Sequence, residues 1–300
     1  MSISKPLIVT GASGWFGRAA LYEYEQMKGP EALRNDVVAC ASSHKEIDIG
    51  SSYGPIPAIP LTNLKDSPAS SGILHLAFLT RDRLNVVGLD NYIKLNRQII
   101  STVDSILKAN PTIPAITTSS GAAAAVSNEK PVSVTDDPYA VLKLEEERMW
   151  KMNSDYRLSY VFRVFAASGR FMKEPRIFAL GDFISQAVSG QRLAINSTHP
   201  VSRSYVNIGC LMRLCWSILL NPMGVGYAQI DACTHSISLH DLARLISSLW
   251  NLPEPYANIN PGFPTDSYTG EIEPFRRLLN KYSIDVPSLE DQIRETSIDI

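Results

Sequence analysis

The sequence has few cysteines, no excess of charge of either sign and no long hydrophobic run. Cys40, Cys210, Cys215 and Cys233 form no Cys-x-x-Cys pair and have no histidine cluster beside them, which argues against a metal site. The formal net charge of −2 gives no reason to expect a nucleic acid partner. No apolar run approaches the roughly 20 residues that span a membrane, and the first residues lack the apolar core of a signal peptide. We therefore expect a cytoplasmic protein without a membrane or metal partner.

The order of the predicted elements indicates the fold class. The chain has 300 residues, of which 45% are hydrophobic and 19% are charged, enough for one large domain or two modest ones. Strand-like and helix-like segments alternate in the first half: strands over 6–10, 36–41, 73–78, 113–117 and 158–163, and helices over 17–27, 91–109 and 139–152. Such alternation predicts a parallel sheet covered by helices on both faces.

The second half is less regular. Apolar periodicity predicts helices over 178–189 and 208–220, a strand over 227–230, and a further helix that begins after Ser238. From Pro253 onward the chain is rich in proline, glycine, asparagine and threonine, but aromatic residues recur within it. We expect this tail to form an ordered, loop-rich lobe.

A glycine-rich loop joins the first predicted strand to the first predicted helix. It consists of Thr10, Gly11, Ala12, Ser13, Gly14, Trp15, Phe16 and Gly17. In such a loop Gly11 allows a tight turn, Gly14 lets the backbone approach a pyrophosphate, and Gly17 lets helix and strand pack closely. The helix N-terminus also offers free N–H groups to phosphates. The context favours a dinucleotide site over a purely structural turn.

Tyr139 precedes Lys143 by four residues in a predicted helix, so the two share a face. An ammonium held near a phenol favours the phenolate and lowers the tyrosine pKa from its usual value of about 10. A tyrosine that exchanges protons is what an alcohol needs when it loses or gains a hydride. An isolated pair of this kind also occurs in ordinary surface helices, so its weight comes from its combination with the glycine loop.

Taken together and in order, these motifs resemble the extended short-chain dehydrogenase/reductase family, which includes nucleotide-sugar epimerases, dehydratases and reductases. The loop has the family's TGxxGxxG spacing, and the segment from His75 to Phe78 resembles its HLAA segment. Matches follow over roughly two thirds of the chain: Asn96, Thr117–Ser120, Tyr139 with Lys143, Arg163–Phe165 and Arg203–Val206.

The resemblance implies an α/β fold: a Rossmann-type doubly wound parallel sheet with a smaller C-terminal α/β substrate lobe. It places the dinucleotide-binding domain at 1–165 plus about 226–250, and the substrate-binding lobe at about 166–225 plus 251–300. The helices over 91–109 and 139–152 would also form a homodimer interface. Core packing alone is the other interpretation of their apolar faces.

The resemblance also implies roles for individual residues. Tyr139 would be the general acid/base, Lys143 would bind the nicotinamide ribose and lower the tyrosine pKa, and Ser120, rather than Ser119, would orient the substrate oxygen. Arg203 would bind the nucleotide diphosphate; a surface ion pair is the alternative. The implied substrate contacts are thus Ser120, Tyr139 and Arg203. The implied cofactor contacts are Gly11, Ala12, Ser13, Gly14, Trp15, Phe16, Gly17, Ser42, Ser43, Lys45, Leu76, Ala77, Tyr139, Lys143 and Phe165.

Two further groups are interpreted as structural. His75 lies within a strand of the family's structural segment, so we do not expect it to be catalytic. The acidic run Glu145–Glu147 is expected to form a solvated helix face.

The end of the second predicted strand departs from the family pattern. NAD-specific enzymes place an Asp or Glu there to bind the ribose hydroxyls, whereas this chain has Ser42, Ser43 and a nearby Lys45. Hydroxyls and an ammonium permit a 2′-phosphate, so the cofactor is NAD or NADP with a lean towards NADP. The family's adenine-contacting Asp is also absent from the segment 61–63.

The segments around the expected substrate site depart as well. Residues 121–124, which follow Ser120, are all small. Sugar 4,6-dehydratases have an Asp-Glu pair at this place, and epimerase–reductases have a cysteine nearby. This chain has neither, which disfavours both activities. Ala166 and the pair Gly209-Cys210 replace residues that usually contact substrate.

The sequence therefore predicts an NAD(P)-dependent epimerase or oxidoreductase that acts on a nucleotide-activated sugar by hydride transfer at a ring carbon, carbon 4. The first alternative is an NADPH-dependent 4-keto-sugar reductase. A reductase of small carbonyl compounds and a non-catalytic dinucleotide sensor are further alternatives. The sugar and the nucleoside diphosphate are not determined.

Overall fold

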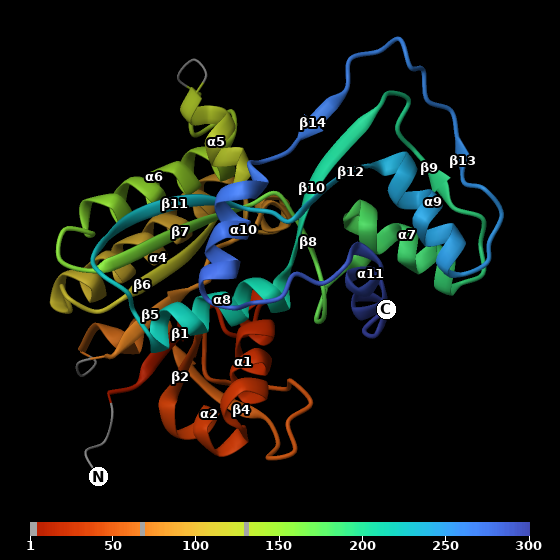
Figure 1. The fold of residues 1–300 in the computed structure, drawn as a ribbon. Helices are drawn as coiled ribbons and strands as arrows, with labels where there is room; N and C mark the ends of the chain where they lie inside the picture. The colour runs from red at the N-terminus through yellow and green to blue at the C-terminus, as the bar shows by residue number, and fades with distance from the viewer. Residues whose placement is uncertain (1–4, 67–69, 129–131) are drawn as a thin grey trace. The chain divides into compact units, whose positions relative to one another are not determined.

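The computed structural model describes residues 5–66, 70–128 and 132–300. The chain divides into two compact units, shown with the rest of the fold in Figure 1. The first unit contains Met1–Arg163 and Met212–Ile230, and the second contains Val164–Leu211 and Asp231–Ile300.

The first unit is built on an eight-stranded sheet in the order β11-β7-β6-β5-β1-β2-β4-β3. Its strands are β1 (Leu7–Thr10), β2 (Val37–Ala41), β3 (Lys45–Ile47), β4 (Ile56–Pro60), β5 (Gly72–His75), β6 (Ala115–Ser120), β7 (Leu158–Val164) and β11 (Gly226–Ala232). β1 pairs in parallel with β2 and β5, and β5 pairs in parallel with β6, whereas β3 is antiparallel to β4. The central strand β1 is buried along its whole length, as expected for a parallel sheet covered on both faces.

Helices lie near all three positions predicted in this unit, and further helices lie between them. They are α1 (Trp15–Lys28), α2 (Pro30–Asp36), α3 (Leu84–Val87), α4 (Leu89–Ala109), α5 (Gly121–Asn128) and α6 (Pro138–Met152), with short 3-10 helices at Leu61–Asp66 and Arg81–Arg83. α4 packs against α6. Ile8, Ile73, Val103 and Trp150 belong to one buried apolar cluster that joins the sheet to these helices.

Helix α8 (Ile208–Leu220) begins in the second unit and continues into the first. In the first unit its Trp216 is fully buried and donates a hydrogen bond from Nε1 to the Ala20 carbonyl of α1 over 2.7 Å. Its ring also meets Tyr24 of α1 edge to face, with the ring centroids 4.7 Å apart. A late segment of the chain therefore fixes the helix that follows the glycine loop.

The second unit has smaller sheets. β10 (Val201–Asn207) pairs with β8 (Ala166–Ser168), β12 (His235–Ser238) and β14 (Asp266–Tyr268), and β9 (Ala194–Ile195) pairs with β13 (Tyr256–Ala257). Its helices are α7 (Ala179–Val188), α9 (Leu239–Leu249), α10 (Ile272–Lys281) and α11 (Leu289–Ser297), with a 3-10 turn at Pro175–Ile177. α7 packs against both α9 and α11.

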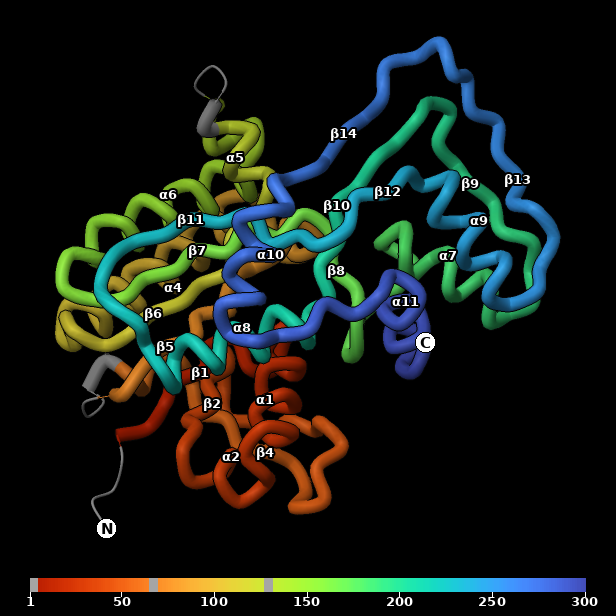
Figure 2. Tube along the Cα trace, viewed as in Figure 1, coloured from red at the N-terminus to blue at the C-terminus, as the bar shows by residue number. Residues whose placement is uncertain are grey.

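The tail from Pro253 is ordered, as the aromatic residues predict. Figure 2 shows it running beside β9 and then beside β10. β13 forms a two-stranded sheet with β9, β14 joins the sheet of β10, and α10 and α11 follow them. Ser168 and Gly169 hold α11 through hydrogen bonds to Gln292 and Thr296.

The compact units divide the chain differently from the predicted domains. Residues 212–225 belong to the first unit because Trp216 packs on α1. Residues 231–250 belong to the second because α9 packs on α7. No helix among the described residues is long and apolar enough to cross a membrane.

Candidate functional site

The glycine loop follows β1 and leads into α1. Gly11 has a φ of +67°, and a Cβ placed on it would lie 2.5 Å from the Leu76 carbonyl group. A Cβ on Gly17 would overlap the Gly11 carbonyl oxygen and lie 2.5 Å from the Cα of Ala12. Only glycine fits at these two positions, because the obstructing atoms belong to the backbone. The loop is thus tightly packed on its inner side.

Gly14 differs from the other two glycines. It is the N-cap of α1, and a Cβ placed there would meet, among the described residues, only the Gly11 carbonyl oxygen at 3.2 Å. Neighbouring Ser13, Trp15 and Phe16 are partly exposed, whereas Ala12 is fully buried. The open side at Gly14 lies at the N-terminus of a helix, where backbone N–H groups and the helix dipole favour a phosphate.

Thr10 connects the loop to β5. Its Oγ1 accepts hydrogen bonds from the N–H groups of Leu76 (3.1 Å) and Ala77 (3.2 Å) and lies 2.6 Å from Nδ1 of His75. Since both lone pairs of the hydroxyl are occupied, its proton points to Nδ1, and the His75 ring carries its own proton on Nε2. The predicted cofactor residues Leu76 and Ala77 therefore border the glycine loop.

The end of β2 lies at the same edge of the sheet as the loop. β1 and β2 are parallel with Thr10 opposite Cys40, and the Ala12 N–H donates to the Cys40 carbonyl over 2.9 Å. Ser42, Ser43 and Lys45, the residues predicted to face a 2′-phosphate, follow directly and are exposed. No carboxylate intervenes between the end of β2 and Lys45.

Ser120 and Tyr139 are brought together by neighbouring elements. Ser120 is the last residue of β6, and α5 starts immediately after it, so the Ala122 N–H donates to Ser120 Oγ over 3.2 Å. Tyr139 lies in the first turn of α6, where Asp137 is the N-cap and accepts from the Ala140 N–H over 3.0 Å. The Ser120 hydroxyl is hydrogen-bonded to the Tyr139 phenol.

The Tyr139 ring is enclosed by groups from the segment after β5. Phe78 meets it edge to face with centroids 5.8 Å apart, and the Arg81 guanidinium lies 5.1 Å from its centroid. Arg81 is paired with Asp137 at 2.9 Å. These contacts fix the ring orientation.

Lys143 is buried, and its ammonium has three partners within the protein. Nζ donates to the Thr118 carbonyl over 2.9 Å and to Oε2 of Glu146 over 2.8 Å. It also lies 3.9 Å from the centroid of the Phe78 ring, a cation–π contact. The lysine charge is therefore compensated inside the fold.

The predicted lowering of the tyrosine pKa by Lys143 stays a prediction, and the net shift in this structure is upward. Burial raises the pKa of Tyr139 above its ordinary value, and the hydrogen bond from Ser120 and the charge of Arg81 only partly oppose that effect. The Glu146 carboxylate contributes further to the rise in pKa. The phenol is therefore protonated at neutral pH in this state.

The acidic run on α6 differs from the prediction. Glu145 is partly exposed and pairs with Arg97, but Glu146 and Glu147 are buried. Glu147 binds Arg163 of β7 through two hydrogen bonds of 2.8 and 2.7 Å. Two of the three carboxylates are thus buried and paired with cations, and the run is not a solvated helix face.

Two predicted residues belong to the second unit. Phe165 packs on Tyr268 with ring centroids 5.0 Å apart. Arg203, predicted to bind a diphosphate, donates to the Asp266 carboxylate over 2.7 Å and to the Asp266 carbonyl over 3.0 Å. The same arginine holds the pKa of Asp266 below its usual value. In this structure Arg203 forms the ion pair that was the alternative interpretation.

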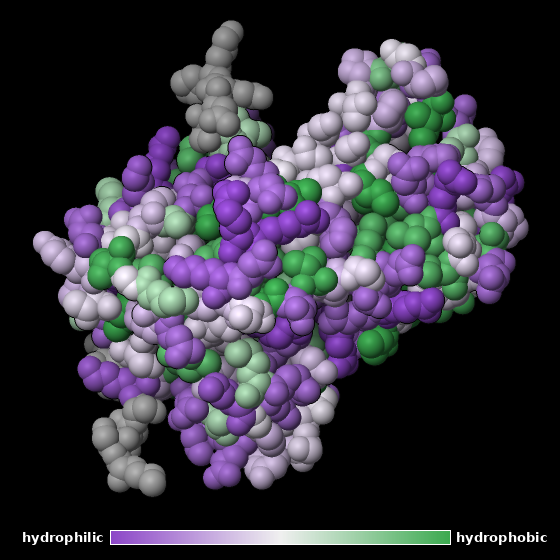
Figure 3. Space-filling view, in the orientation of Figure 1, coloured by the Kyte–Doolittle hydropathy of each residue, from purple (hydrophilic) through white to green (hydrophobic). Residues whose placement is uncertain are grey.

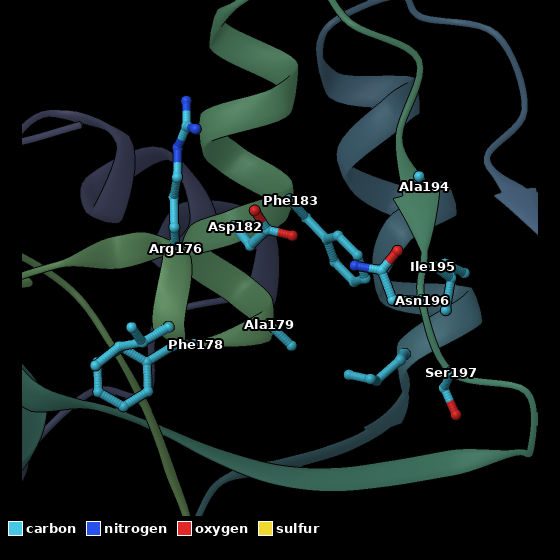
Figure 4. A pocket seen from close by; sticks show the side chains of 11 residues that line it. Arg176, Phe178, Ala179, Asp182, Phe183, Ala194, Ile195, Asn196 and Ser197 are labelled. Carbon is cyan, nitrogen blue, oxygen red and sulfur yellow. The ribbon is translucent and has the colours of Figure 1, made fainter. Parts of the chain in front are cut away.

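The second unit has a cavity that is not predicted from the sequence. It has a volume of about 160 Å³ and is lined by residues from α7, β9 and the turns beside them. Figure 4 shows Phe183 directed from α7 towards Asn196, while the Arg176 side chain extends away. Apolar side chains reach the surface over α7 and α9 in the space-filling view (Figure 3), and Phe178 and Val188 at the two ends of α7 are exposed. The lining combines residues distant in sequence, so no local motif indicates the cavity.

Sequence comparison gives no relative, since no family model and no curated protein matches the chain. Solved structures match along almost its whole length. MoeE5 in complex with UDP-glucuronic acid and NAD has a TM-score of 0.71 at 18% identity, covering 98% of each chain. The UDP-N-acetylglucosamine 4-epimerase of Methanobrevibacter ruminantium M1, in complex with UDP-N-acetylmuramic acid, has a TM-score of 0.70 at 21% identity, covering 98% of this chain and 97% of that one.

A third match is the UDP-glucose 4-epimerase of Thermotoga maritima with UDP-glucose, at a TM-score of 0.67 and 16% identity, covering 98% of this chain and 97% of that one. The chain has the fold of these proteins. The predicted Rossmann-type α/β class, with its large and mostly parallel sheet, is confirmed.

Proposed function

We propose that this protein is an NAD(P)-dependent epimerase or oxidoreductase of a nucleotide-activated sugar, with hydride transfer at carbon 4. The observation that supports it most directly is the hydrogen bond between Ser120 and Tyr139, with Lys143 one helical turn away. β6 is joined to β1, and so to the glycine loop, through β5. Structures with the same fold include proteins described with UDP-sugars and NAD.

In this proposal each residue acts on one oxygen of the sugar. Tyr139 exchanges a proton with that oxygen at its phenol, and Ser120 donates a hydrogen bond that orients it. Phe78 and Arg81 keep the tyrosine ring in place. When bound, the nicotinamide supplies or accepts the hydride at the carbon that bears this oxygen.

The residues at the edge of the sheet fit a dinucleotide. The open side of Gly14 would admit the pyrophosphate at the N-terminus of α1. Gly11, Ala12, Ser13, Trp15, Phe16 and Gly17 would shape the loop, Leu76 and Ala77 would border it, and Lys143 would approach the nicotinamide ribose. The exposed hydroxyls of Ser42 and Ser43 and the ammonium of Lys45 support a site for a 2′-phosphate, hence NADP.

One observation favours the reductase alternative. A reductase needs a protonated acid when the carbonyl oxygen receives its proton, and the raised pKa of Tyr139 keeps the phenol in that form. The absence of a carboxylate after β2 leaves room for the 2′-phosphate of NADPH, which is the usual reductant. An epimerase must both oxidise the alcohol and reduce the ketone, and therefore needs the phenolate as well.

Further parts of the proposal concern partners. We propose that Arg203 contributes to diphosphate binding after its ion pair with Asp266 opens, and that the α7–β9 cavity accommodates an apolar or aromatic group such as a base. We also propose a homodimer formed through α4 and α6. The Arg97–Glu145 ion pair links these two helices on their outer side.

The first experiment identifies the nucleotide released when freshly purified protein is denatured, by mass and by nicotinamide absorbance. Stoichiometric NAD or NADH indicates an epimerase that retains its cofactor. Protein that is free of nucleotide and then binds NADPH more tightly than NADH indicates the reductase. If neither oxidised nor reduced dinucleotides bind, the proposal is wrong.

The second experiment is Tyr139→Phe, which removes only the phenol oxygen. We expect turnover with an authentic nucleotide-sugar to fall by about 10²-fold or more, as for loss of a general acid/base, while dinucleotide binding persists. Near-normal turnover would contradict the assigned role of Tyr139. A non-catalytic sensor would show no turnover before the substitution.

A further inference from the structure

We propose that Glu146 is a positioning residue for the dinucleotide site: a buried counter-ion that holds the Lys143 ammonium and thereby sets the relative affinity for oxidised and reduced nicotinamide. The inference rests on the proposed dinucleotide function. The sequence predicts an exposed Glu146, whereas the structure buries it completely.

The ammonium of Lys143 is almost completely shielded from solvent. Its side chain is 7% exposed, and its contacts are the Thr118 carbonyl, the Glu146 carboxylate and the Phe78 ring. The carbonyl and the ring are neutral, so Glu146 provides the only formal negative charge in direct contact with Nζ among the described residues. The two side chains form a buried pair with no net charge.

The carboxylate is itself held from two sides. Oε2 accepts from Lys143, and Oε1 lies 2.9 Å from Nε2 of His75. Nε2 carries the ring proton, because Nδ1 already accepts from Thr10, but this close contact does not have the geometry of a hydrogen bond. Trp150 stacks on the imidazole with centroids 5.7 Å apart. A chain of contacts thus runs from the strand before the glycine loop through His75 and Glu146 to Lys143.

The other charges nearby are already matched. Arg81, from the segment after β5, pairs with Asp137, and Glu147 pairs with Arg163 of β7. The remaining titratable groups that touch this cluster are Tyr139, which is protonated at neutral pH, and His75, which contacts Glu146 and not Lys143. Among the groups in direct contact with Lys143, the charge therefore depends on Glu146.

This charge affects the two forms of nicotinamide differently. The oxidised ring is positively charged and the reduced ring is neutral, so an uncompensated ammonium at the ribose opposes the oxidised form. By neutralising Lys143, Glu146 would favour the oxidised form. A residue with a merely structural role would change the affinity for both forms together.

The test is a charge cycle on the full-length protein. The variants are Glu146→Gln, Lys143→Met and the double variant, and the matched control is Glu145→Gln on the exposed side of the same helix. Dissociation constants of the oxidised and reduced dinucleotide are measured by fluorescence at about pH 6.5 and about pH 8.5. The lower value keeps an isolated lysine protonated and the higher value keeps an isolated carboxylate ionised.

We expect Glu146→Gln to weaken binding of the oxidised dinucleotide about tenfold relative to binding of the reduced one at the lower pH, as for one uncompensated charge nearby. The quantity compared between variants is the ratio of these two dissociation constants. Lys143→Met should shift the ratio in the opposite direction at the higher pH. The double variant removes both charges and should return the ratio towards that of the wild type, and Glu145→Gln should leave it unchanged. Ratios within twofold of the wild type in both single variants would overturn the inference.

Folding and the proposed function are controlled separately. If Glu146→Gln does not fold, because an unpaired buried ammonium is costly, the comparison of Lys143→Met with the double variant still isolates the carboxylate. An unchanged ratio there also overturns the inference. If the wild type binds neither form, the proposed function fails instead, so the two failures are distinguishable.

Discussion

Replacing Gly17 by alanine should destabilise the first unit, although alanine is the better helix former. Gly17 lies in α1, and its absent Cβ would occupy the space of the Gly11 carbonyl oxygen and approach the Cα of Ala12 to 2.5 Å. Both obstructing groups are backbone, so no side-chain rotation can relieve the overlap. The helix must move away from the loop, or the loop must open.

The magnitude follows from two opposing terms. Overpacking a tight contact costs about 1–3 kcal/mol, and a backbone obstruction places this case near the upper end. Alanine in a helix interior gains about 1 kcal/mol over glycine. The net loss is about 2 kcal/mol, which corresponds to a decrease of about 4–8 °C in the melting temperature of a domain of 150–250 residues.

The matched control is Gly14→Ala in the same loop. Gly14 has a φ of −75°, which alanine adopts without strain, and its side is open apart from the Gly11 carbonyl oxygen at 3.2 Å. We expect a loss of about 0.5–1 kcal/mol from the poorer N-cap but a decrease in dinucleotide affinity of at least about tenfold. Urea unfolding and dinucleotide titration measure both quantities. A Gly17→Ala protein as stable as the wild type would refute the packing argument.

Three further predictions concern titratable groups. Because burial keeps the Tyr139 phenol protonated, the single-turnover rate of carbonyl reduction should stay level across neutral pH, while the rate of alcohol oxidation should rise with pH; the reverse dependence would contradict the assigned proton state. The pKa values of Tyr24 and Tyr92 are raised by burial, so above about pH 10 the unfolded chain binds fewer protons than the folded one. The urea midpoint of unfolding should therefore fall as pH rises beyond that value. An unchanged midpoint would contradict the raised tyrosine pKa values. Burial also raises the pKa of Cys40 to about 12, so iodoacetamide should label it only after unfolding; rapid labelling of native protein would disagree.

The sequence predicts the elements whose periodicity is strong. The helix expected over 91–109 is α4 (Leu89–Ala109), and the strand expected over 158–163 is β7 (Leu158–Val164). Short elements were not predicted, because they have little pattern of their own. β3 forms only through its antiparallel pairing with β4, and α5 arises from a run of small residues that indicates neither a strand nor an amphipathic helix.

The local motifs of the candidate site were predicted better than its electrostatics. The spacing of the glycines and of Tyr139 and Lys143 is visible in the chain, and each lies on the predicted element. The partner of Lys143 is not visible, because a carboxylate three residues later on a helix resembles an ordinary surface pair. Its burial depends on β5 and on Trp150, which tertiary structure alone brings to it.

The inward face of α6 explains both why the acidic run was misinterpreted and how Tyr139 is aligned. This face buries Lys143, Glu146 and Glu147 among apolar residues such as Trp150. Apolar contacts tolerate small shifts, whereas buried ionic groups stabilise a fold only when their geometry is good. Glu147 binds β7 and Lys143 binds the Thr118 carbonyl of β6, so α6 is fixed to two adjacent strands by directional contacts. The first turn of the same helix therefore meets the end of β6 in one register, the register in which Tyr139 reaches Ser120.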